Sequence, residues 1–386
     1  MAGLRAAEWL RQGGYDGELT IIGAEEHNPY DRPPLSKQVL VGKADFDDLT
    51  LRVEAGFEAD WNLGIRATGL DLDAKRVLLE GGDDVPFDRL VIATGAHPRI
   101  LPNAEPGPGV HYLRTVEDAL ALRDDFAGAH RVAVIGAGFI GLEVASSARQ
   151  LELAVTVIEA LPVPLERAIG ADMGTAVAAM HRRHGVDVRL GTGVEGLVGT
   201  SRAEGVRLAG GTVIPADVVV VGIGVTPTTG WLEGSGLDLA DGVVCDERLR
   251  ALSGGRPRPD IVAVGDVARW THPGYGETVR IEHWTNAADQ GEAAARTLLE
   301  GDGAPPYAPT PYFWSDQHGA KLQFVGATRP GDTVTVIEGD PAEDRFVAAY
   351  GRNGRLVAAL GVRRPARVMA LQRLIASGSP FPPPPT

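Results

Sequence analysis

A strand–glycine–helix–strand pattern in the middle of the chain constrains the fold more than any other feature. Residues 131–160 read RVAVIGAGFIGLEVASSARQLELAVTVIEA. An apolar strand runs into Gly136, Gly138 and Gly141 at GxGxxG spacing, a helix follows, and a second apolar strand ends in Glu159. The glycines alone would be weak evidence, because the chain is rich in glycine. Together with the strands, the helix and the terminal acid they predict a dinucleotide-binding βαβ unit rather than a βαβ unit without a ligand.

Each part of this pattern has a physical task. Gly136 permits a tight turn, Gly138 lets the backbone approach a pyrophosphate, and Gly141 lets the helix and the strand pack closely. The N-terminus of the helix offers N–H groups and a positive dipole end to the phosphates. Glu159 can accept hydrogen bonds from ribose hydroxyls but would repel a 2′-phosphate, so the pattern favours NADH over NADPH.

The first residues of the chain repeat this motif from its third glycine onward. GLRAAEWLRQ (3–12) matches GLEVASSARQ (141–150) at coinciding spacings, and a second strand follows that ends in Glu25. The two halves also end in similar segments, FDRLVIATG at 87–95 and PADVVVVGIG at 215–224. We therefore expect two dinucleotide-binding units. The first lacks its leading strand and first two glycines, as if about a dozen residues were missing, so we expect it to bind its cofactor poorly. An ordinary N-terminal helix is the alternative, but it does not explain the coinciding spacings.

Composition excludes several classes of function. The net charge of −14 argues against nucleic acid or an anionic membrane surface as the main partner. The longest apolar run, at 218–225, is far shorter than a membrane span, and the N-terminus has no signal-peptide core, so we place the protein in the cytoplasm. The single cysteine, Cys245, cannot form an internal disulfide, and we interpret it as a small buried residue of a strand. The nine histidines show no metal-binding spacing, so we expect no metal.

The remaining sequence completes an α/β architecture with a third, α+β part. A buried strand at 260–266 and a helix at 282–300 return to the first unit. Four alternating runs between 321 and 362 predict an antiparallel sheet, closed by a helix at 366–378 and followed by an unstructured tail at 379–386. We thus predict two Rossmann-like domains and a C-terminal α+β domain with an antiparallel sheet. The expected boundaries are 1–107 with 230–304 for the first domain, 108–229 for the second and 305–386 for the third.

Seven short motifs, spread over nearly the whole chain, point to one family. They are PYDRPPLSK (29–37), ATG (93–95), LRTVEDA (113–119), GAGFIGLE (136–143), VGD (264–266), EHW (282–284) and PYFWSDQ (311–317). In this order the sequence resembles the FAD-containing, NADH-dependent ferredoxin reductases that serve bacterial cytochrome P450s and aromatic-ring dioxygenases, the type of putidaredoxin reductase and rubredoxin reductase. The resemblance implies FAD in the first unit, NAD in the second, and a small [2Fe-2S] ferredoxin as the electron acceptor.

The resemblance also implies roles for individual residues. Glu25 would bind the FAD adenosine ribose, and Arg114 and Asp266 would hold the phosphate and ribityl regions. A helix beginning near Glu282 would direct its N-terminus at the flavin pyrimidine ring, where reduction places negative charge. The cofactor-binding residues expected in this way are Gly3, Glu25, Arg32, Lys37, Ala93, Thr94, Gly95, Arg114, Gly136, Gly138, Gly141, Glu159, Gly224, Asp266, Glu282, His283, Trp284 and Trp314. For the two tryptophans, which would flank the flavin ring, burial in the core is the alternative interpretation.

Lys37 and Glu143 are the expected catalytic pair. By resemblance they lie together beside the flavin, where disulfide reductases of the wider superfamily place a cysteine. From the residues alone, a surface lysine and an exposed helical glutamate would be the ordinary interpretations.

The predicted reaction is hydride transfer from NADH to FAD followed by single-electron transfer to the ferredoxin, with the chemistry carried by the cofactor. A rubredoxin reductase and a non-catalytic, NADH-responsive redox-sensing flavoprotein remain alternatives. Residues 346–386 contain six arginines and no Asp or Glu, so we expect an acidic ferredoxin to dock there, unless the run is only a solvated basic face.

Overall fold

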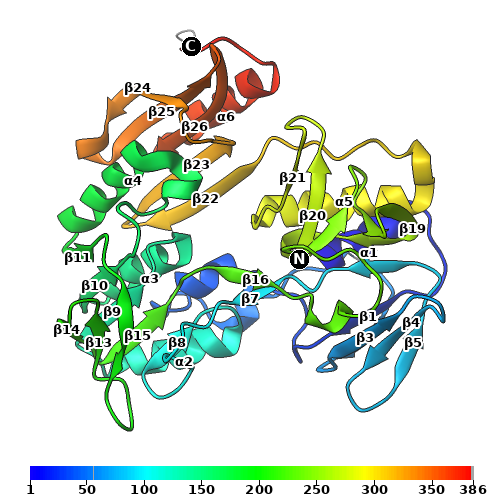
Figure 1. Ribbon diagram of the computed structural model, residues 1–386, viewed down its shortest axis with the longest axis horizontal. Helices are drawn as coiled ribbons and strands as arrows, with labels where there is room; N and C mark the ends of the chain where they lie inside the picture. Colours follow the sequence, from blue (N-terminus) through cyan, green and yellow to red (C-terminus); the bar gives the residue numbers. More distant parts are fainter. Residues whose placement is uncertain (55, 384–386) are drawn as a thin grey trace. The chain divides into compact units, whose positions relative to one another are not determined.

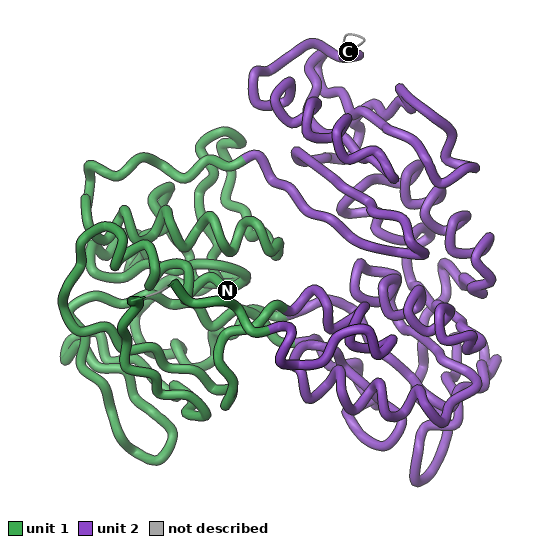
Figure 2. The backbone as a smooth tube through the Cα atoms, turned by 180° about the vertical axis from the view of Figure 1, so that it is seen from behind, with its two compact units in different colours: residues 1–31, 50–97, 226–309 green, residues 32–49, 98–225, 310–386 purple. Residues whose placement is uncertain are grey.

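The structure, a computed structural model, describes residues 1–54 and 56–383 of the chain. It divides into two units, which Figure 2 shows in different colours. Unit 1 consists of residues 1–31, 50–97 and 226–309, and unit 2 of residues 32–49, 98–225 and 310–386. Each unit has its own hydrophobic core.

Unit 1 is an α/β fold around a sheet with the strand order β21-β20-β17-β18-β19-β6. The strands are β6 (Leu90–Ile92), β17 (Val243–Cys245), β18 (Arg250–Ser253), β19 (Arg256–Ala263), β20 (Ala268–His272) and β21 (Glu277–Val279). Two helices, α1 (Ala2–Gln12) and α5 (Trp284–Glu300), pack closely against each other. A Cβ atom at Gly291 of α5 would lie 2.8 Å from the backbone nitrogen of Ala6, so the crossing requires glycine. Cys245 is fully buried in the core, which confirms the interpretation of this residue.

Smaller sheets complete unit 1. β1 pairs with β2 in parallel, and β3, β4 and β5 form an antiparallel sheet. β7 pairs with β16 where the chain leaves and re-enters unit 1. Their bounds are β1 (Thr20–Gly23), β2 (Asp60–Leu63), β3 (Ala67–Asp71), β4 (Arg76–Leu79), β5 (Asp84–Pro86), β7 (Ala96–Pro98) and β16 (Val225–Pro227). Short 3₁₀ helices are η3 (Gly230–Leu232), η4 (Gly265–Val267) and η5 (Gly301–Gly303).

Unit 2 contains a parallel sheet with the order β11-β10-β9-β15-β8. Its strands are β8 (Val110–Tyr112), β9 (Arg131–Ile135), β10 (Ala154–Ile158), β11 (Val186–Arg189) and β15 (Val218–Val221). All four valines of β15 are buried, as expected for a strand paired on both edges and covered on both faces. The connecting helices are α2 (Val116–Ala127), which begins with a capping box at Thr115, α3 (Phe139–Gln150) and α4 (Glu166–Arg183). Unit 2 also holds η1 (Pro33–Ser36), η2 (Phe46–Leu49) and an antiparallel sheet of β12 (Val194–Val198), β13 (Gly205–Leu208) and β14 (Val213–Pro215).

The C-terminal part of unit 2 is the antiparallel sheet that the sequence predicted, with α6 (Pro365–Ala376) packed on it (Figure 1). The strand order is β22-β23-β26-β25-β24. The strands are β22 (Tyr312–Gln317), β23 (Ala320–Gly326), β24 (Thr333–Asp340), β25 (Arg345–Arg352) and β26 (Arg355–Val362), with η6 (Pro341–Glu343) before β25. The prediction of an unstructured tail is wrong for its first residues. Pro380 forms a β-bridge with Arg355, and Phe381 packs on the core of this sheet. Burial of the apolar ring stabilises this position. Residues 384–386 lie outside the described residues.

The fold class is therefore confirmed, as an α/β protein with a C-terminal antiparallel sheet. The division into two units does not delimit three domains, so the three-domain boundaries remain a prediction. Among the described residues, no helix combines the length and the apolar character needed to cross a membrane.

Candidate functional site

The glycine motif of unit 2 forms a tight turn between β9 and α3. Gly136 has a φ of 100°, and a Cβ atom there would lie 2.3 Å from the carbonyl oxygen of Gly222. A Cβ atom at Gly141 would lie 2.2 Å from the Gly136 oxygen, so only glycine lets the helix approach the turn. Gly138 is the N-cap of α3, makes no side-chain cap, and the first helical turn holds no acidic residue. The turn therefore fits the pyrophosphate of a dinucleotide.

Glu159, just after β10, is fixed against this turn. Its Oε2 accepts a hydrogen bond of 2.7 Å from the Ala137 amide, and its Oε1 accepts one of 2.8 Å from the Leu161 amide. A carboxylate has about four lone-pair sites, so acceptor capacity remains for ribose hydroxyls. The residues present thus fit an NAD-binding unit.

Glu143 lies in a buried polar cluster in unit 2, two residues beyond the last glycine. Its Oε2 accepts hydrogen bonds from Lys37 Nζ at 2.8 Å and Ser36 Oγ at 2.5 Å, and its Oε1 accepts one from Ser315 Oγ at 2.7 Å. The side chains of Lys37 and Glu143 are only 12% and 7% exposed, which excludes the surface interpretations of both residues. The structure therefore brings the expected pair together, Lys37 from the end of η1 and Glu143 from α3. Its place beside a flavin remains a prediction.

The two serines of this cluster were not predicted from the sequence. Ser36 stands beside Lys37 in PPLSK, and Ser315 is the serine of PYFWSDQ, where alternation along β22 turns it to the buried face. A further hydroxyl, Ser147 Oγ of α3, donates to the Ser36 carbonyl at 2.7 Å and ties the lysine-bearing segment to the helix. The available signal was position, because each serine stands next to a predicted site residue, Ser36 beside Lys37 and Ser315 beside Trp314.

The other predicted residues of unit 2 lie in several places. Arg32 Nη1 donates to the Arg114 carbonyl at 2.6 Å, so these two are neighbours. Gly224 has a φ of 99°, and its carbonyl accepts from the Arg99 amide at 3.0 Å. Trp314 is half-buried on β22, with the Lys321 ammonium 5.8 Å from its ring centre.

In unit 1, the predicted residues lie at the N-termini of helices and at the ends of strands. A Cβ atom on Gly3 in α1 would meet the Ala93 side chain at 3.2 Å, so the helix lies close to the segment that follows β6. Thr94 Oγ1 donates to the Thr228 carbonyl at 2.8 Å, and Gly95 next to it has a φ of 67°. Glu25 follows β1 and accepts a 2.5 Å hydrogen bond from the Tyr30 hydroxyl.

The start of α5 gathers the remaining predicted residues. Asp266 lies in η4, which packs on α5, and Glu282 pairs with Arg280. His283 is the N-cap of α5, and burial lowers its pKa to about 4, so it is neutral at neutral pH. Trp284 donates its indole N–H to Asp31 at 2.7 Å. With no acidic residue in its first turn, α5 fits a partner that gains negative charge, as a reduced flavin does.

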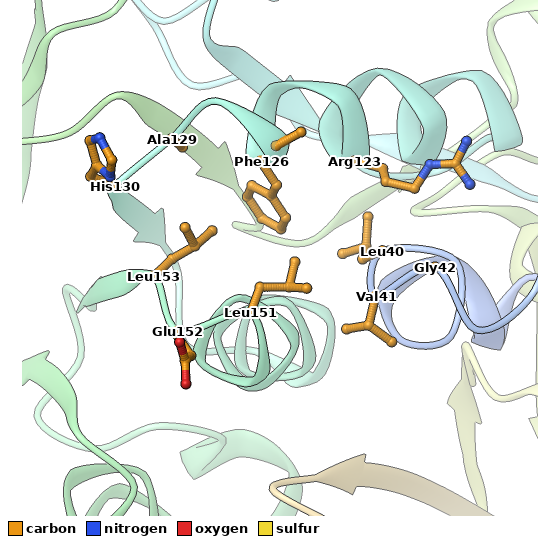
Figure 3. A pocket seen from close by; sticks show the side chains of 11 residues that line it. Leu40, Val41, Gly42, Arg123, Phe126, Ala129, His130, Leu151, Glu152 and Leu153 are labelled. Carbon is orange, nitrogen blue, oxygen red and sulfur yellow. The ribbon is translucent and has the colours of Figure 1, made fainter.

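Unit 2 also has a groove of about 520 Å³, which Figure 3 shows from close by. Leu40, Val41, Phe126, Leu151 and Leu153 give it an apolar lining. Leu151 follows the last residue of α3, whereas the glycine turn is at the first residue. A 12-residue helix is about 18 Å long, so the groove is separate from the predicted nucleotide-binding turn.

The described residues offer neither a reactive cysteine nor a metal site. Burial raises the pKa of the Cys245 thiol, which makes it unreactive, and it has no second cysteine to pair with. The described residues contain no group of three or more His, Cys, Asp or Glu that could hold a metal ion.

Comparison with known proteins decides the family. Residues 1–291 match the family described as pyridine nucleotide-disulphide oxidoreductase, and residues 312–385 match the reductase C-terminal family. The chain belongs to the pyridine nucleotide-disulphide oxidoreductases. It is 40% identical to rhodocoxin reductase of Rhodococcus erythropolis, over 99% of this chain and 89% of that protein. It is 39% identical to the ferredoxin–NAD(+) reductase component of the anthranilate 1,2-dioxygenase system of Burkholderia cepacia, over 98% and 92%.

A solved structure supports the same conclusion. The covalent putidaredoxin reductase–putidaredoxin complex superposes with a TM-score of 0.92 at 34% identity, covering 98% of this chain and 91% of that one. The resemblance drawn from the seven motifs is therefore confirmed. As a member of this family the protein uses FAD and NAD(H) as cofactors.

Proposed function

We propose that the protein is an NADH-dependent ferredoxin reductase that delivers electrons to a small [2Fe-2S] ferredoxin serving a cytochrome P450 or an aromatic-ring dioxygenase. The observation that carries this proposal is the construction of α3. The helix starts at a nucleotide-binding turn and, one turn later, bears Glu143 in a buried pair with Lys37. The names of the relatives, which include reductase components of oxygenase systems, agree with it.

FAD, held by the first unit, would supply the redox chemistry that links a two-electron donor, NADH, to a one-electron acceptor. The chain's own residues bind and orient. The glycine turn at Gly136–Gly141 binds the NADH pyrophosphate, and Glu159 selects the unphosphorylated ribose. Glu143 neutralises and orients Lys37, and because both side chains are nearly buried, the low local dielectric constant strengthens their interaction.

The organisation of this function follows the sequence prediction. FAD belongs to residues 1–107 and 230–304, with Glu25, Asp266 and the start of α5 as contacts, and NADH to residues 108–229. The C-terminal domain, 305–386, bears Trp314. We place the protein in the cytoplasm, where a pool of reduced NADH and an intracellular ferredoxin would serve it.

Steady-state reduction assays with the purified, FAD-loaded protein test this function. We expect rapid NADH-driven reduction of ferricyanide and of cytochrome c coupled through a [2Fe-2S] ferredoxin. Coupling through rubredoxin but not through ferredoxins would assign a rubredoxin reductase instead. Slow turnover with every acceptor, despite tight binding of NADH, would contradict an enzyme and favour the redox-sensing alternative.

A further inference from the structure

A chain of hydrogen bonds leads from Glu143 along the buried face of β22 to a cluster of histidines, His181, His184 and His318. Ser315 Oγ, which donates to Glu143, lies 3.0 Å from Gln317 Nε2. Gln317 Oε1 lies 2.9 Å from His181 Nε2, on α4, and His181 Nδ1 lies 3.1 Å from His318 Nε2. The residues come from positions 143, 181 and 315–318, so only the fold joins them.

The proton positions along this chain follow from its carboxylate end. A carboxylate paired with a lysine is ionised and can only accept hydrogen bonds, so the Ser315 hydroxyl donates its one proton to Glu143. Ser315 must then accept from Gln317, which leaves the Gln317 carbonyl to accept from His181 Nε2–H. With its proton on Nε2, a neutral His181 accepts at Nδ1 from His318 Nε2–H. Every donor thus points toward Glu143, and bonds aligned in this way polarise one another.

The chain is both buried and neutral at its outer end. Ser315, Gln317 and His181 are each 0% exposed. Burial lowers the pKa of His181 to about 4. The pKa of His318 falls to about 3, through burial and the neighbouring His181, His184 and Arg149. Both rings are therefore uncharged at neutral pH, so the histidines fix proton positions rather than supply charge.

We propose that Gln317 and His181 are positioning residues for the Lys37–Glu143 pair, acting through Ser315 to hold the Glu143 carboxylate in one orientation. The proposal rests on the proposed function, because it matters where Lys37 is held only if hydride transfer occurs beside it. Without the Gln317 amide, the Ser315 oxygen loses its donor and its hydroxyl is free to rotate away from Glu143. The carboxylate is then fixed from the Oε2 side alone.

Gln323 offers a matched control. It is a second buried glutamine of the same sheet, 5% exposed on the neighbouring strand β23, and it donates to the Tyr312 hydroxyl instead of joining the chain. Gln317→Leu and Gln323→Leu therefore remove the same groups from the same sheet, and only the first interrupts the path to Glu143.

The kinetic test is anaerobic single-turnover reduction of the FAD-loaded protein by NADH, followed by the loss of flavin absorbance. We expect Gln317→Leu to lower the limiting rate about 10-fold, with little change in NADH affinity, since a small displacement of a group that orients the reactants lowers the rate by about this order. Gln323→Leu should keep the normal rate. His181→Gln, which can still donate to Gln317, should keep more of the rate than His181→Leu. Equal losses of rate in Gln317→Leu and Gln323→Leu, or no loss in Gln317→Leu, would overturn the proposal.

The tautomers of the histidines can be measured in the unmodified protein, so this test depends neither on turnover nor on whether a variant folds. Long-range ¹H–¹⁵N spectra of the unmodified protein should show the Nε2–H tautomer for both His181 and His318 at neutral pH. An Nδ1–H tautomer at His181 would break the chain and overturn the proposal whatever the kinetics. Failure of NADH to reduce the unmodified protein would instead overturn the proposed function, so the two failures are distinguishable.

Discussion

Removing the charge of Glu143 should show how much its ion pair with Lys37 contributes to the free energy of unfolding. The Nζ–Oε2 distance is 2.8 Å, and both side chains are nearly buried. At an effective dielectric constant of about 20 this corresponds to about 6 kcal/mol of attraction, against about 1.5 kcal/mol in water. Part of that attraction offsets the cost of burying the two charges. Glu143→Gln leaves the ammonium without a counter-ion and presents an amide N–H to a site that faces three donors. We therefore expect a loss of about 3–5 kcal/mol in the free energy of unfolding.

A double-mutant cycle with Lys37→Met isolates the interaction. We expect a coupling free energy of about 3 kcal/mol from urea unfolding of the four proteins, because the double variant leaves neither charge stranded. Asp187 and Arg189 provide the comparison: they pair at 2.8 Å with both side chains about half exposed, and their cycle should give less than about 1 kcal/mol. A Lys37–Glu143 coupling below about 0.5 kcal/mol would refute the reasoning, since it would mean that the pair is as well solvated as a surface pair.

Three further predictions concern specificity, pH and docking. Glu159→Arg should narrow or reverse the preference for NADH over NADPH in kcat/KM, whereas equal efficiency with both in the unmodified protein would contradict the role of Glu159. Because the pKa of His181 falls from 6.5 to about 4 on folding, the unfolded chain binds the proton first, and stability should be lost as the pH falls from about 6.5 to 4. Between about pH 7.5 and pH 5 the share of His181 in this loss should be about 2 kcal/mol in urea unfolding, and His181→Gln should reduce the total loss by that amount, because His283 and His318, whose pKa values also fall on folding, keep their own shares. Arg363→Glu should slow ferredoxin reduction, most at low salt, and leave ferricyanide reduction unchanged; a normal rate and salt dependence would place the docking face elsewhere.

The local elements were predictable because their signals are local. The periodicity of 131–160 and the alternating runs after 320 each set a strand or a helix within a few residues, and β9, α3, β10 and β23 to β26 lie there. The Lys37–Glu143 pair was reached only through the family resemblance, since nothing in the spacing of two residues 106 positions apart indicates contact.

The polar chain behind that pair could not have been predicted from the sequence. Ser315 and Gln317 share one face of β22, which alternation does indicate, but their partner His181 comes from α4. Burial of Gln317 likewise runs against the usual exposure of glutamine, and it is tolerated because both ends of the amide are satisfied. Such contacts depend on how the C-terminal sheet packs on α3 and α4, which no short stretch of sequence encodes.

The charge of the basic run at the C-terminus also could not be judged from the sequence alone. The run contains six arginines and no acidic residue along the chain. In the fold, however, acidic side chains from β24 and the segment before it pair with three of these arginines. Arg352 pairs with Asp332 at 2.6 Å, and Arg364 and Arg367 both pair with Glu338. A charge reversal at those two arginines would repel Glu338 and disturb the sheet, which would confuse a loss of docking with a loss of structure. Arg363 is exposed, and among the described residues it reaches a backbone carbonyl, at 3.5 Å, but no acidic side chain, so its charge can be reversed without leaving an acid unpaired. The single substitution therefore tests the docking of an acidic ferredoxin more cleanly than any combination with its neighbours.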